Sequence, residues 1–138
     1  MTKKRHILDS GPLVAFMNRD DRYHAWSVSV LGSLDAPPLI CEPVITEVCW
    51  HLRSAPAAVA RVLEMPARGE LQVCSLLGLE GVNLAGKVRK YASRMDLADA
   101  CVLRLAEKTP DAVVITLDTR DFEIYRLYRD DPVPLLHP

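Results

Sequence analysis

Four carboxylates are spaced along the chain at places where a folded domain could bring them together. Asp9 and Asp118 each follow an apolar run, at 7–8 and 112–117, that predicts a buried strand. Ligands of open parallel sheets bind just beyond the carboxyl ends of the strands. One acid at such an end is commonly a turn residue or a helix cap, but two at equivalent ends indicate a site.

Asp99 is the most informative of the four acids. The segment 97–108 predicts a strongly apolar helix, and Asp99 and Arg104 are its only ionisable residues before position 107. Burying an unpaired carboxylate costs several kcal/mol, so a polar or ionic partner is expected. Asp96 directly precedes this helix and is the better cap, which leaves Asp99 needing another explanation.

Glu47 completes the set, within a helix that Pro43 opens. Alone it would be read as an exposed helix residue. Four converging carboxylates repel one another and raise one another's pKa values. Mg²⁺ or Mn²⁺ relieves that repulsion, because hard cations prefer carboxylate oxygen. Such an ion can activate water and stabilise charge on a phosphate, so the acids predict metal-assisted phosphate chemistry.

The elements that would position these acids alternate between strands and helices. The pattern predicts strands at 7–8, 39–41, 71–74, 112–117 and 133–136, and helices at 13–17, 20–34, 43–52, 57–65, 79–93 and 97–108, with a short helical segment after 118. Alternation of this kind indicates an α/β fold with a parallel sheet between two layers of helices.

Composition limits the class of protein. The chain has 138 residues, 49% of them apolar and 25% charged, which fits a single globular domain over 1–138. The net charge of −1 argues against coating nucleic acid by bulk charge, but it allows a local basic groove. The four cysteines form no C-x-x-C pair, so zinc is not expected and a reducing cytoplasm is the simplest location. No apolar run reaches the length of a membrane span.

Four short motifs, in this order, resemble the PIN-domain family. They read Leu8-Asp9-Ser10-Gly11-Pro12-Leu13-Val14-Ala15, Ile45-Thr46-Glu47-Val48, Met95-Asp96-Leu97-Ala98-Asp99-Ala100 and Thr116-Leu117-Asp118-Thr119-Arg120-Asp121-Phe122. Each motif alone is weak, but four in order over essentially the whole chain are specific. The chain is similar in particular to the VapC-type toxins of prokaryotic toxin–antitoxin pairs.

The resemblance implies a PIN-like three-layer α/β/α sandwich with a central parallel sheet. It also implies Mg²⁺- or Mn²⁺-dependent cleavage of RNA, homodimerisation, and inhibition by a cognate antitoxin protein. The family's four acids fall on Asp9, Glu47, Asp99 and Asp118. Asp96 is an extra candidate ligand, and Asp121 is expected to cap or brace the local turn.

Acidic residues cannot attract a polyanion, so other side chains must contact the RNA. The candidates are Lys87, Lys90, Arg94, Arg120, Ser10 and Thr116. Lys87, Lys90 and Arg94 recur at spacings of three and four, which places them on one helix face just before the acids. That face is either an RNA-contacting rim or an ordinary solvated surface, and turn and strand chemistry would equally explain the two hydroxyls.

Apolar helix surface predicts the homodimer independently of the resemblance. Trp26, Val30, Trp50 and the helix 57–65 offer more apolar face than one small sheet needs.

Two alternatives stay open on the sequence alone. One is a non-catalytic module that binds RNA or a protein partner, if the acids do not converge. The other is phosphoryl transfer through an aspartyl intermediate at Asp9, although Gly11 stands where phosphatases of that kind carry a second acid.

Overall fold

The computed structural model describes residues 3–138, and within them strands and helices alternate as expected. The strands are β1 (Arg5–Leu8), β2 (Leu39–Cys41), β3 (Gln72–Cys74), β4 (Ala112–Ile115) and β5 (Leu135–Leu136). The helices are α1 (Ser10–Met17), α2 (His24–Gly32), α3 (Glu42–His51), α4 (Pro56–Glu64), α5 (Leu77–Lys90), α6 (Leu97–Lys108) and α7 (Thr119–Phe122).

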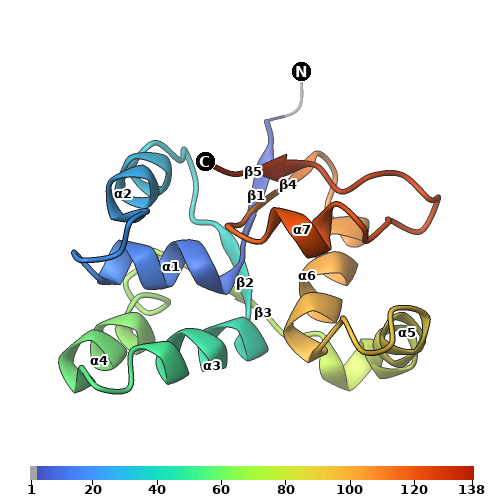
Figure 1. The fold of residues 1–138 in the computed structure, drawn as a ribbon, viewed down its shortest axis with the longest axis horizontal. Helices are drawn as coiled ribbons and strands as arrows, with labels where there is room; N and C mark the ends of the chain where they lie inside the picture. Colours follow the sequence, from blue (N-terminus) through green and yellow to red (C-terminus); the bar gives the residue numbers. More distant parts are fainter. Residues whose placement is uncertain (1–2) are drawn as a thin grey trace.

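The five strands form one parallel sheet in the order β3-β2-β1-β4-β5. Helices α1 to α4 lie on one side of the sheet and α5 and α6 on the other, which makes the predicted three layers (Figure 1). Strands β1 and β4 are direct neighbours, with Leu8 beside Ile115. Each acid follows a buried strand as predicted, and the two strands are adjacent at the centre of the sheet.

The strands are apolar runs because both faces of the sheet are covered. All residues of β2 and β4 are buried, and so are Ile7 and Leu8 of β1. Helix α6 packs against β1, β2 and β4, and its apolar residues from Ala98 to Ala106 are buried. This rigid centre holds the carboxyl ends of β1 and β4 side by side.

Some element boundaries differ from the sequence prediction. Helix α2 begins at His24 rather than near 20, because the Asp21 carboxylate accepts a hydrogen bond from the Tyr23 amide and forms a turn ahead of the helix. Strand β4 ends at Ile115, two residues early, since the hydroxyl of Thr116 accepts the amide of Asp118 and turns the chain. Within residues 3–138, no helix is long and apolar enough to span a membrane.

Candidate active site

The carboxyl edge of the central sheet holds a cavity of about 420 Å³, called here the acidic cavity. The residues that line it are Asp9, Ser10, Gly11, Glu47, Arg94, Asp96, Asp99, Leu117, Asp118 and Asp121. All four predicted catalytic acids therefore meet in one cavity, together with the extra acids at 96 and 121. They come from four separate parts of the chain, so only the fold brings them together.

Asp9 is fixed at the floor of the acidic cavity. It caps α1, and one carboxylate oxygen accepts the Ser10 amide at 2.8 Å. The other oxygen accepts the hydroxyl of fully buried Thr116 at 2.7 Å. Burial raises the pKa of Asp9, and the nearby carboxylate of Asp118 adds to the effect.

Thr116 connects the two strand ends that carry the acids. Its hydroxyl donates to Asp9 and accepts the amide of Asp118 at 2.9 Å. Because a hydroxyl can donate one hydrogen bond while accepting others, a single side chain orients both loops. The structure therefore gives Thr116 a positioning contact with Asp9, rather than an open position on the surface.

Asp96 and Asp99 divide their roles as the sequence indicated. Asp96 caps α6, accepting the amide of Asp99 at 2.9 Å. The Asp99 carboxylate accepts the hydroxyl of Tyr125 at 2.8 Å instead of capping the helix. Burial, outweighing that hydrogen bond, raises the pKa of Asp99 to about 7.

Tyr125 is a site residue that the sequence reading missed. It is fully buried, and its ring packs edge-to-face on Phe122 and Tyr91 at centroid distances of 5.3 and 5.0 Å. The three-residue spacing of Phe122 and Tyr125 marks a common apolar face. Nothing in that spacing shows that the hydroxyl reaches Asp99.

Glu47 enters the cavity from α3, which packs against α6. Burial, followed by the charge of Asp96, raises the pKa of Glu47 to about 7. Glu47 and Asp99, two carboxyl groups of one cavity, therefore both have a raised pKa of about 7. Perturbation of this kind is typical of functional sites.

Asp118 and Asp121 form the outer wall of the acidic cavity. Asp118 caps α7 and accepts the amide of Asp121 at 3.1 Å, and burial raises its pKa. The Asp121 carboxylate pairs with Arg94 at 2.7 Å. Asp121 thus braces this corner of the fold, while Arg94 is the one basic residue lining the cavity among the residues described.

The donor set suits a hard divalent cation in its chemistry, because the described residues lining the cavity include several carboxylates and no thiol or imidazole. Within residues 3–138, however, no three His, Cys, Asp or Glu side chains are arranged as a ready cation site. Oxygens of Asp9, Asp96 and Asp118 instead accept protein N–H or O–H groups. Joint coordination of one cation would require some of these carboxylates to turn towards one another.

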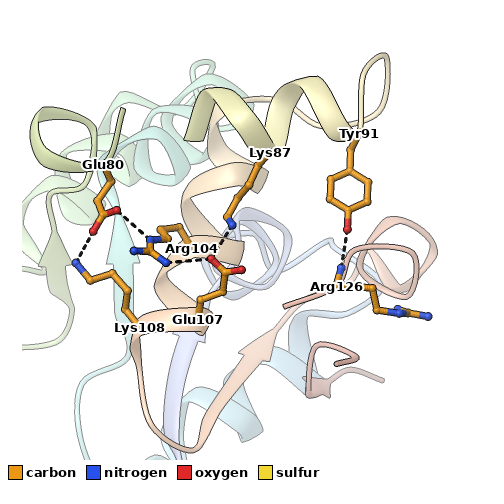
Figure 2. Close-up of polar contacts among 7 residues, drawn as sticks. All are labelled: Glu80, Lys87, Tyr91, Arg104, Glu107, Lys108 and Arg126. Carbon is orange, nitrogen blue, oxygen red and sulfur yellow. Dashed lines mark hydrogen bonds and ion pairs between the residues drawn. The ribbon is translucent and has the colours of Figure 1, made fainter. Parts of the chain in front are cut away.

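Lys87 lies elsewhere than the sequence predicted. Its ammonium pairs with Glu107 at 2.6 Å, within an ion-pair network that joins α5 to α6 (Figure 2). The same network includes Arg104, which contacts both Glu107 and Glu80. The Glu107 side chain is 2% exposed, and Lys87 does not line the acidic cavity. This pairing gives Lys87 a structural role in place of the predicted RNA contact.

Replacing Lys87 with Met should destabilise the protein by about 1–3 kcal/mol, because it leaves the buried Glu107 carboxylate with fewer partners. Activity per folded molecule should not change. Urea unfolding would measure the stability, with Lys90→Met as the matched control, since Lys90 is exposed. Equal effects of the two replacements would contradict the structural role of Lys87.

The other RNA-contact candidates lie on the surface or in the site. Lys90 is exposed and its ammonium lies 5.3 Å from the ring centre of Tyr91, while Arg120 is exposed beside Asp118. Arg94 and Ser10 line the acidic cavity. Contact of these four residues with RNA remains a prediction.

The surface predicted to form a dimer is only partly available. Trp26 and Val30 pack against the chain's own core. Trp50 is 61% exposed, with the Arg53 guanidinium 3.8 Å from its ring centre, and Leu63 of α4 is 59% exposed. The dimer remains a prediction, now centred on α3 and α4.

Two solved structures of similar shape are a VapC toxin and a VapBC complex. No protein-family model matches the sequence, and no curated protein matches it either. VapC20 of Mycobacterium tuberculosis, a sarcin–ricin loop cleaving toxin, is similar with a TM-score of 0.75 and 14% identity, over 84% of this chain and 92% of that chain. The DNA-bound VapBC of Salmonella typhimurium gives 0.60 and 14%, over 98% of each chain. The chain therefore has the PIN-like fold of the VapC toxins.

Proposed function

We propose that this protein is a divalent-metal-dependent ribonuclease and the toxin of a toxin–antitoxin pair. The observation that carries the proposal is the convergence of Asp9, Glu47, Asp99 and Asp118 in one cavity at the carboxyl edge of a parallel sheet. Burial, with the charges of neighbouring carboxylates adding to it, raises the pKa values of Glu47 and Asp99, and a bound cation would favour their ionised forms. The shared fold with an RNA-cleaving VapC toxin supports the same conclusion.

The four acids would hold Mg²⁺ or Mn²⁺, with Asp96 as a further donor. When bound, such an ion lowers the pKa of water and stabilises negative charge on a phosphate. Thr116 and the Ser10 amide keep Asp9 facing the cavity, and Tyr125 fixes the orientation of Asp99. Arg94 stands at the rim, where its guanidinium can leave Asp121 and meet an RNA phosphate.

The structural similarity to VapC toxins also suggests which partners this protein binds. VapBC is a complex of this kind of toxin with its antitoxin, which supports a cognate antitoxin for this chain. RNA is the proposed substrate, and a homodimer is the proposed assembly.

An aspartyl nucleophile is disfavoured by the contacts of Asp9. Both of its oxygens already accept hydrogen bonds, and the side chain is buried. These hydrogen bonds draw electron density from both oxygens and make each a weaker nucleophile, while leaving lone pairs that can bind a cation. A non-catalytic binding module is separated from the nuclease by the assay below.

The direct test is cleavage of a labelled single-stranded RNA by the purified chain. We expect cleavage with Mg²⁺ or Mn²⁺, loss of cleavage after EDTA, and recovery when the metal is restored in excess. An Asp99→Asn preparation purified in parallel controls for contaminating nucleases. Cleavage that persists in EDTA would reject the metal dependence, and no cleavage with either ion would reject the ribonuclease.

A further inference from the structure

A second cavity, of about 520 Å³, opens beside the acidic cavity. Glu47 and Asp96 line both cavities, so the two share a wall. The second cavity lies at the carboxyl ends of β2 and β3, where Cys41 and Cys74 are paired in register. Its volume falls in the range of small-molecule sites. A ligand in the acidic cavity can therefore place a neighbouring group here.

The chemistry of this second cavity differs from that of the first. Much of its wall is apolar, formed by Cys74, Leu76, Leu77, Leu97, Ala98 and Cys101. Leu77 and Leu97 are 59% and 40% exposed, so the apolar wall is open to solvent. The charged groups are the carboxylates of Glu42, Glu47 and Asp96, and no Lys, Arg or His of the described chain lines it. Such a cavity repels phosphate and accepts an uncharged, flat group that donates N–H bonds.

We propose that this cavity, the base pocket, binds the unpaired RNA base next to the phosphodiester bond that is cut. This inference rests on the proposed ribonuclease function. A base is tethered to its phosphate through one sugar, which matches two cavities with a common wall. Ionised carboxylates only accept hydrogen bonds, so amino-bearing guanine, adenine and cytosine are favoured over uracil where these acids are ionised. Sequence-specific RNA-binding proteins commonly capture such splayed bases.

The test fills the pocket from an open position. Gly78 lines the base pocket, and a Cβ there would meet nothing within 4 Å, so Gly78→Phe should fold normally. Gly86 lies on the same helix, is equally open and does not line the pocket, so Gly86→Phe is the matched control. Both replacements should leave the helix intact, which unfolding curves would verify.

The measurement uses short RNAs with each base in turn at the positions flanking the cut. Cleavage is measured with Mn²⁺. Binding is measured by fluorescence anisotropy with Ca²⁺ in place of Mn²⁺, in proteins that also carry Asp99→Asn so that the RNA is not cut during the measurement. For the wild-type protein, we expect one flanking position where amino-bearing bases are favoured over uracil and over an abasic residue by about tenfold or more. Gly78→Phe should abolish that preference and weaken binding similarly, whereas Gly86→Phe should match the wild type.

A second variant tests the hydrogen-bonding part of the inference. Glu42→Gln adds a donor to the pocket and should shift the preference towards uracil, while the exposed Glu123→Gln should not. Equal binding of all bases, or a Gly78→Phe protein that keeps the wild-type preference, would overturn the base pocket. If binding depends on the base but no RNA is cut, the base pocket is supported and the ribonuclease function is rejected. If RNA is cut without any base preference, the ribonuclease function is supported and the base pocket is rejected.

Discussion

Replacing Asp99 with Asn should reduce RNA cleavage by at least about 10²–10³-fold while leaving the fold intact. Asn keeps an oxygen that can accept the Tyr125 hydroxyl, so the 2.8 Å contact and the local packing should survive. The change removes the negative charge that a divalent cation requires. Loss of that charge also eases repulsion with Asp96 and Asp9, the charges that help raise the pKa of Asp99.

Two readouts separate a ligand from a structural residue. The Asp99→Asn protein should melt at the same or a higher temperature than the wild type in EDTA, yet gain less when Mn²⁺ is added. Asp131→Asn, which changes an exposed acid, should behave as wild type in both assays. Full cleavage by the Asp99 variant would contradict its assignment as a ligand and weaken the nuclease proposal.

The sequence could predict those acids of the site whose positions follow from a local pattern of apolar and acidic residues. Asp9 and Asp118 follow apolar strands, and a parallel sheet aligns its carboxyl ends. Asp96 and Asp99 were separable because one precedes an apolar helix and the other lies inside it. Chain order and periodicity contain this information.

The parts that sequence could not predict depend on contacts between distant elements. Thr116 reaches Asp9 across 107 residues, and Tyr125 reaches Asp99 through a packed aromatic cluster. Lys87 shows the opposite failure, since a helical spacing cannot tell which face of α5 meets the buried Glu107 of α6. Side-chain direction between packed helices follows from tertiary packing, which spacing alone does not specify.

Without metal, the protein should become less stable as the pH rises from about 5 to about 8. The pKa values of Glu47 and Asp99 are about 7 in the fold, above their ordinary values of 4.5 and 3.8. Between those limits the folded protein binds protons that the unfolded chain has lost. The free energy of unfolding therefore falls as pH increases, and the decline ends once both groups are ionised.

The cause can be isolated by a double variant. Melting temperatures in EDTA should decline with pH more steeply for the wild type than for the protein carrying both Glu47→Gln and Asp99→Asn, in which Asp9 and Asp118 still have raised pKa values. His6 has a lowered pKa and acts in the opposite direction, but it is present in both proteins and cancels in their difference. The pKa of Glu80 is lowered, so this carboxylate changes the stability of the protein only in solutions more acidic than this pH range.

Excess Mn²⁺ should remove or reverse the wild-type decline in melting temperature, because the cation binds the ionised carboxylates and its affinity grows as they lose protons. An identical pH profile for the two proteins would contradict the raised pKa values, and with them the electrostatic reason for a cation at this site.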